Sequence, residues 1–209
     1  MELDNFIRQR PYLYHLTNVQ NAENIISERR IYSANKIIEL SGDSYDNINR
    51  RRRIEHTEIK VGEQSYFLRD QRPISEKALA KCLTGGWQVS DFLYHLNDRV
   101  FMWPTLDRLW RHFNRYEHEN PVILRFHTRE IIDSNPHVKF CRLNSGATRA
   151  NSYLGGKAPE RGEHTFLSAE QFGRPIREVA EVTFENECKF KLPIARGLRP
   201  DGEFTPITL

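Results

Sequence analysis

His15 is the first side chain in this sequence whose position suggests chemistry. It lies in the stretch Tyr12–Thr17, whose aromatic and apolar residues predict a strand. A polar turn follows and leads into a short amphipathic helix that Asn18 or Asn21 can cap. We therefore expect His15 at a strand end, where polar side chains often meet ligands. A core histidine bonded to the backbone fits the same spacing.

Four consecutive arginines, Arg50–Arg53, form the second candidate group. The planar guanidinium fork suits phosphate and pyrophosphate. If the run is helical, successive side chains diverge by about 100°, so only one or two of them can face one ligand. A solvated basic surface is the alternative. Downstream, a predicted strand over Ser65–Leu68 ends in Arg69 and Asp70, which can line a site or pair with each other to fix the loop.

A glutamate near the C-terminus is the third candidate. Arg177–Phe184 predicts the last strong strand, with alternate apolar residues on one face and Glu181 on the other. A glutamate on the solvated face of a sheet is usually inert, so periodicity alone does not select Glu181. Glu178, on the opposite face, is the alternative.

The segment Asn144–Thr165 is rich in glycine, serine, asparagine and charge. It is longer than ordinary connections, which predicts a functional or mobile loop. A plain surface loop is the alternative. Its candidate substrate-binding side chains are Arg149, Tyr153, Arg161 and His164.

Helices are predicted between the arginine run and this loop. Ser75 and Ser90 can each cap a helix, and Thr105 caps a third whose apolar residues recur at helical spacing and form one buried stripe. The outer face of the third helix carries arginines that suit either solvation or contact with phosphates. They are Arg108, Arg111 and Arg115.

Strands are predicted over Pro121–His127 and Val138–Leu143, and a short helix or turn over Thr128–Asp133. The tail, Lys189–Leu209, contains three prolines and predicts irregular wrapping. Together these elements predict a mixed α+β fold.

The composition favours one globular domain over residues 1–209, with 38% hydrophobic residues in a chain of 209. The net charge of +3 is too small to argue nucleic-acid binding alone. Cys82, Cys141 and Cys188 lack metal-ligand spacing, which predicts reduced cysteines, no metal and a cytoplasmic location. No apolar signal core and no membrane-spanning run is present.

Four stretches resemble the DarT family of nucleic-acid ADP-ribosyltransferases, in the same order along the chain. The first is the pattern His15, Thr17, Asn21 and Ile25. The others are SYDNINRRRR over 44–53, SYFLRDQRPI over 65–74 and VAEVTF over 179–184. The segment over 83–119 is longer than in that family, and the loop over 144–165 matches it poorly.

This resemblance implies a split β-sheet fold that binds NAD+ between two small sheets and has peripheral helices, with an expanded helical segment at about 75–119. It assigns His15 to the nicotinamide ribose and Asn21 to the dinucleotide. Counting from the Ser-Tyr pair, it assigns the catalytic arginine to Arg52, with Arg51 as the nearest competitor. Glu181 bonds the ribose 2′-hydroxyl, stabilises developing positive charge and receives the acceptor's proton. The resemblance also places three further side chains near NAD+, namely Thr17, Tyr66 and Arg69.

The implied reaction transfers ADP-ribose from NAD+ to a nucleic-acid base and needs no metal. Rossmann and P-loop glycine motifs are absent, which agrees with this fold. Single-stranded DNA is favoured over RNA as acceptor, and a free nucleotide or a protein is the alternative. The resemblance further implies a toxin or phage-defence role with a neutralising antitoxin. A binding module without catalysis is the competing hypothesis.

Overall fold

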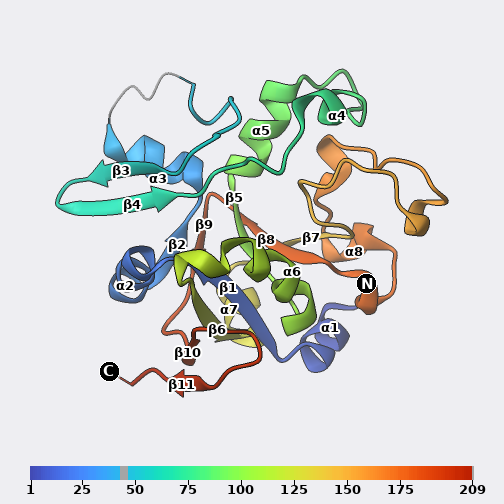
Figure 1. The fold of residues 1–209 in the computed structure, drawn as a ribbon. Coiled ribbons are helices and arrows are strands. Elements are labelled where there is room, and N and C mark those ends of the chain that lie inside the picture. Colours follow the sequence, from blue (N-terminus) through green and yellow to red (C-terminus); the bar gives the residue numbers. More distant parts are fainter. Residues whose placement is uncertain (43–46, 209) are drawn as a thin grey trace.

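The computed structural model describes residues 1–42 and 47–208, except for the side chain of Tyr153. Its largest sheet is antiparallel with strand order β1-β6-β10-β11 (Figure 1). The strands are β1 (Tyr12–Thr17), β6 (Val122–His127), β10 (Ala195–Gly197) and β11 (Phe204–Pro206). β1 and β6 pair along their whole length, from Tyr12 opposite His127 to Thr17 opposite Val122. Apolar side chains from both strands enter the core, which explains the strength of their sequence signal.

A second antiparallel sheet has the order β5-β8-β7. Its strands are β5 (Arg99–Met102), β8 (Glu181–Glu185) and β7 (Lys139–Cys141). The two sheets meet where Tyr14 and Trp103 exchange backbone hydrogen bonds of 3.0 and 2.9 Å. This junction brings β1 close to the end of β5 and so joins the two sheets.

Two short ribbons complete the strands. One pairs β2 (Arg30–Tyr32) with β9 (Glu187–Lys189), and the other pairs β3 (Thr57–Val61) with β4 (Gln64–Leu68). The β3–β4 hairpin extends away from the main sheet and its turn contains Gly62, whose positive φ of 59° suits glycine (Figure 1).

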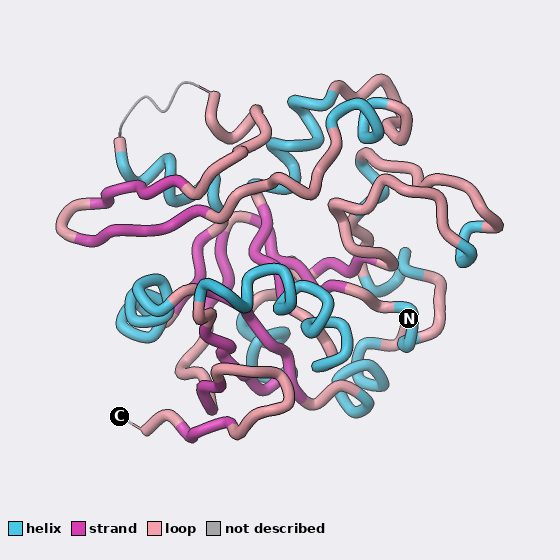
Figure 2. The backbone as a smooth tube through the Cα atoms, in the orientation of Figure 1, coloured by secondary structure: helices cyan, strands magenta, loops and turns pink. Residues whose placement is uncertain are grey.

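The helices lie around the sheets, and loops make up much of the segment between β7 and β8 (Figure 2). The α-helices are α1 (Leu3–Gln9), α2 (Val19–Glu28), α3 (Ala34–Ser41), α4 (Glu76–Ala80), α5 (Val89–Asn97), α6 (Leu106–Tyr116), α7 (Thr128–Ser134) and α8 (Ala169–Phe172). Short 3₁₀ turns are Glu117–Glu119, Ser152–Leu154, Glu163–Thr165 and Ile176–Glu178. Within the described ranges, no helix combines the length and apolar character needed to cross a bilayer.

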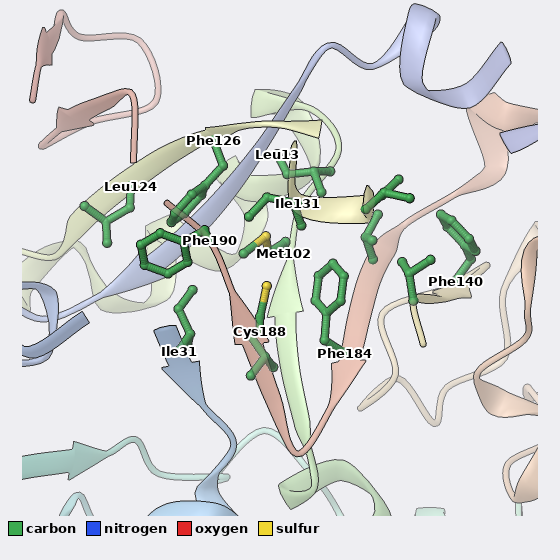
Figure 3. Packing of buried hydrophobic residues seen from close by; sticks show 14 of the residues in the cluster. Leu13, Ile31, Met102, Leu124, Phe126, Ile131, Phe140, Phe184, Cys188 and Phe190 are labelled. Carbon is green, nitrogen blue, oxygen red and sulfur yellow. The ribbon is translucent and has the colours of Figure 1, made fainter. Parts of the chain in front are cut away.

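The main hydrophobic core lies between the two larger sheets and the helices α1, α2 and α7. Figure 3 shows that side chains from both sheets meet in it. They include Leu13, Met102, Leu124, Phe126 and Phe184. Most of these residues are fully buried, so the sheets are held by packing across their faces as well as by strand pairing.

The mixed α+β fold class is confirmed, and so are the strand Tyr12–Thr17 and the Asn18 and Thr105 caps. Two predictions of local structure are wrong. The tail is not merely irregular, because β10 pairs with β6 inside the main sheet. Ser90 lies within α5, whose N-cap is Gln88. The arginine run does not meet the condition of being helical, since residues 47–50 form a turn and 51–53 are irregular.

Candidate functional site

A cavity of about 690 Å³ lies where the end of β1 approaches β4, α6, the loop over 144–149 and the start of β8. Its volume falls in the range of small-molecule and cofactor sites. Predicted site residues on its wall are His15, Thr17, Asn21, Tyr66, Arg69, Arg149 and Glu181. The fold therefore brings together side chains separated by most of the chain.

Glu181 is the buried acid of this cavity and is only 6% exposed. The prediction that it lies on a solvated face is wrong, because the loop over 144–149 covers that face of β8. Its Oε2 accepts a hydrogen bond of 2.9 Å from the backbone N–H of Ser145. Burial raises the pKa of Glu181 to about 7, against the lowering effects of Ser145, Arg161 and Arg108. Such a carboxyl can hold or release a proton near neutral pH.

Arg161 fixes the loop that covers Glu181. Its side chain is buried and does not line the cavity. Instead its guanidinium donates to the carbonyl of Asn144 at 2.8 Å and to that of Ala147 at 3.0 and 2.9 Å. The predicted substrate contact is thus, in this structure, a brace that orients Ser145 toward Glu181.

His15 lines the cavity at the end of β1. Its Nδ1 lies 2.9 Å from the carbonyl oxygen of Phe101. Because a carbonyl only accepts, Nδ1 carries the proton, and Nε2 of the neutral ring is an acceptor. Burial lowers the pKa of His15 to about 4, helped by the positive charge of Arg69. The side chain is therefore neutral at physiological pH and suited to bind a hydroxyl.

A row of side chains in ring and cation–π contact, from α6 and its neighbours, forms another part of the wall. His112 stacks on Trp103 with ring centres 4.7 Å apart, and Tyr116 lies 5.1 Å beyond His112. The guanidinium of Arg69 lies over the ring of Tyr116, 4.4 Å from the ring centre. We call these four residues, all lining the cavity, the aromatic ladder.

The ladder is the main feature that sequence reasoning missed. The helical stripe identified the core positions of α6, but His112 and Tyr116 lie on the neighbouring face. Their i, i+4 spacing was the available signal. Nothing local indicated that Trp103, after β5, would stack beside them.

One member of the arginine run lines the cavity, and it is Arg53. It is buried and donates to Asn97 Oδ1 at 2.9 Å and to the carbonyl of Arg69 at 3.1 Å. Burial lowers its pKa to about 10. Arg52 donates to the carbonyl of Ile74 at 2.9 Å, and neither it nor Arg51 lines the cavity. The Ser-Tyr pair from which Arg52 was counted, Ser44 and Tyr45, lies outside the described residues.

Two predicted NAD+ contacts have their polar groups bonded within the protein. The amide of Asn21 donates to the carbonyl of Phe67 and accepts from its N–H, both at 2.9 Å, which docks α2 on β4. The hydroxyl of Tyr66 hydrogen-bonds Glu28, and lies 3.0 Å from Gln64 Oε1. Thr17 is buried at the end of β1.

The remaining candidates lie apart from this wall. Glu178 pairs with Arg142 through a contact of 2.7 Å and does not line the cavity. His164, in a 3₁₀ turn, is exposed and also lies outside the lining. The side chain of Tyr153 is not described.

The cavity wall is rich in positive charge. Its described lining contains six arginines and three carboxylates, and the histidines His15 and His112 are neutral because burial lowers their pKa to about 4 and about 3. An anionic ligand fits this balance. Among residues 1–42 and 47–208, no group of three or more acidic, histidine or cysteine side chains is arranged to hold a metal ion.

Comparison with known proteins gives one match. Neither the curated proteins nor the solved structures yielded a match to the chain. Residues 11–189, which include every element that builds the cavity, match the family described as "Family of unknown function (DUF7002)". The chain belongs to the DUF7002 family.

Proposed function

We propose that the protein transfers ADP-ribose from NAD+ to a nucleic-acid base. The description of its family carries no activity, so the proposal depends on the cavity and on the resemblance of four stretches to DarT enzymes. One observation carries it most directly. Glu181, which is buried and has a pKa of about 7, lines the same cavity as His15, although 166 positions separate them.

The chemistry proposed here breaks the bond between nicotinamide and ribose C1′. Nicotinamide leaves with the bonding electrons, and a nitrogen of the acceptor base attacks C1′. Ionised Glu181 stabilises the positive charge that develops on the ribose and then takes the proton that the acceptor nitrogen loses. Each atom and charge is thereby accounted for without a metal.

His15 and the loop over 144–149 have supporting roles in this proposal. The neutral imidazole offers Nε2 as an acceptor to a ribose hydroxyl, which orients C1′. The Ser145 N–H holds the carboxylate of Glu181 in one position before any ligand arrives. Arg149 lies on the same loop and lines the cavity, where it can contact an acceptor phosphate.

The architecture is compatible with the split-sheet fold that we propose with this activity. The sheets β1-β6-β10-β11 and β5-β8-β7 meet at Tyr14 and Trp103, and the cavity lies beside that junction. Single-stranded DNA is the favoured acceptor, ahead of RNA. The proposal includes a toxin or phage-defence role in the cytoplasm, opposed by an antitoxin protein.

The test is incubation of the protein with NAD+ and mixed single-stranded DNA and RNA oligonucleotides, followed by mass spectrometry. We expect an oligonucleotide heavier by one ADP-ribose and release of nicotinamide. Glu181→Gln should reduce this transfer by about 10²- to 10⁴-fold, because the general base and charge stabilisation are lost.

Glu178→Gln is the matched control, three residues away in the same segment but paired with Arg142 outside the cavity. It should retain transfer. Activity that survives Glu181→Gln, or that disappears only with Glu178→Gln, contradicts the assignment. A wild-type protein that shifts oligonucleotides on a gel without modifying them supports the binding-module hypothesis instead.

A further inference from the structure

Two buried hydrogen-bond donors on the aromatic ladder have no partner within the described structure. They are Nε1 of Trp103, a residue only 4% exposed, and Nη2 of Arg69. Leaving such a group unpaired costs about 1–3 kcal/mol, so it is uncommon in a folded protein. Both residues line the cavity, so a ligand whose binding shifts the neighbouring side chains slightly can supply the missing acceptors.

These donors belong to one continuous surface. Trp103, His112, Tyr116 and Arg69 follow one another at 4.7, 5.1 and 4.4 Å. These ring and cation–π contacts restrict each side chain, so neither donor can turn far enough to reach another protein group without breaking the row. Arg99 also lines the cavity, but it does not belong to this row, and its Nη1 lies 3.1 Å from the carboxylate of Glu185.

The charge around the ladder favours an anion. Arg115 lines the cavity next to Tyr116 and forms no ion pair with any described residue. Two cavity carboxylates, Glu119 and Asp70, act on Arg69. Glu119 is shared between Arg69 at 3.6 Å and His56 at 2.8 Å, and Asp70 lies 3.6 Å from His56. Both orphaned groups are donors, so the ligand must supply acceptors. Phosphate oxygens combine acceptor capacity with negative charge.

We infer that the aromatic ladder is a phosphate-binding wall, on which Trp103 and Arg69 donate to the diphosphate of a nucleotide and Arg115 balances its charge. That the nucleotide is NAD+ rests on the proposed function, whereas the phosphate chemistry rests on the ladder alone. The site lies in the segment that is expanded relative to DarT proteins, and it uses residues outside the resembling stretches except Arg69.

The experiment is calorimetric titration of the protein with ADP, adenosine and inorganic pyrophosphate. We expect ADP to bind more tightly than adenosine, pyrophosphate to compete with ADP, and the advantage of ADP to shrink as salt is added. Trp103→Phe keeps an aromatic ring but removes the N–H, and should weaken ADP about tenfold while changing adenosine little. Arg69→Gln should weaken ADP at least as much.

Trp110→Phe is the matched control, since Trp110 lies on α6 outside the cavity lining and packs against Phe113. It should bind ADP like the wild type. Thermal melting identifies variants that unfold. If Trp103→Phe does so, Arg69→Lys replaces it as the test, because lysine keeps the charge but loses the planar fork and should still weaken ADP.

Equal binding of ADP and adenosine, or unchanged ADP affinity in folded Trp103→Phe and Arg69→Gln, overturns the inference. Its failure is distinguishable from failure of the proposed function. If ADP binding depends on the ladder but no ADP-ribose is transferred, the phosphate-binding wall is supported and the proposed enzyme activity is contradicted. If transfer is lost with Glu181→Gln but ADP affinity does not depend on the ladder, the enzyme activity is supported and the phosphate-binding wall is contradicted.

Discussion

The two sides of the cavity differ in how completely their polar groups are satisfied. On the acid side, Glu181 already accepts from Ser145, and Arg161 holds the loop by three hydrogen bonds. On the ladder side, Trp103 and Arg69 keep donors without acceptors. The acid side is therefore organised without a ligand, whereas we propose that the ladder side is completed by one. On these proposals, the difference separates residues that shape the reaction from residues that recognise the ligand.

The variant with the largest expected effect disrupts the acid side of the cavity and leaves the aromatic ladder intact. Arg161→Gln removes a buried guanidinium, which deprives the carbonyl of Ala147 of both its Arg161 bonds and leaves that of Asn144 with only the N–H of Ala147. We expect a loss of ~3 kcal/mol in the free energy of unfolding and a collapse of transfer. Urea denaturation measures the first and the oligonucleotide assay the second.

Arg142→Gln provides the comparison for that variant. Arg142 forms a partly exposed pair with Glu178, and such pairs contribute about 0–1 kcal/mol. If Arg142→Gln destabilises the protein as much as Arg161→Gln, the loop brace has no special role. ADP affinity of folded Arg161→Gln should stay near that of the wild type, because the ladder is intact.

The next effect concerns the pKa of Glu181, raised from 4.5 to about 7. Between pH 4.5 and 7 the unfolded chain ionises this group while the folded protein keeps its proton. The unfolded state then binds fewer protons, so stability falls as pH rises, by ~3 kcal/mol for this group. The full contribution of this group to stability is present below pH 4.5.

Other groups titrate in the same window with the opposite slope, notably His15 and His112, whose folded pKa values are lowered. The measurement is therefore the difference between wild type and Glu181→Gln in urea unfolding across pH 4 to 8. Glu181→Gln should gain stability relative to wild type as pH rises. A constant difference across this range would show that Glu181 ionises as an ordinary carboxyl.

The smallest expected effect concerns the arginine that supports the ladder side of the cavity. Arg53 lines the cavity and donates to the carbonyl of Arg69, whereas Arg52 donates to the carbonyl of Ile74 and does not itself line the cavity. We expect Arg53→Lys to weaken ADP binding and transfer about tenfold, and Arg52→Lys to have a smaller effect. The reverse order would restore the catalytic role that the resemblance to DarT proteins assigns to Arg52.

Local sequence patterns predicted those elements whose residues fix their own conformation. The strand Tyr12–Thr17, the Asn18 cap and α6 depend on alternation, capping and helical spacing, which are all readable nearby in the chain. The position of β10 in the main sheet was missed because its partner β6 lies about seventy positions earlier. Three residues of strand carry too little periodicity to reveal such a pairing.

The same limit applies to the site. The sequence identified His15 and Glu181 as candidates through their places in resembling motifs. It did not predict that Glu181 is buried, because the residues that cover it come from a loop over thirty positions earlier. The ladder likewise depends on Trp103 and Arg69 meeting α6, and the choice of Arg53 within its run depends on the distant Asn97.

The docking of α2 on β4 has a consequence for association between molecules. Asn21 bonds both backbone groups of Phe67, and Asn24 donates to the carbonyl of Ser65 at 2.9 Å. These backbone groups lie on the outer edge of the β3–β4 hairpin, where a strand from another molecule could otherwise pair with them. One face of a helix thus closes the edge of the β3–β4 hairpin with side-chain amides. We expect Asn21→Ala together with Asn24→Ala to expose that edge and promote aggregation, an outcome that light scattering can detect.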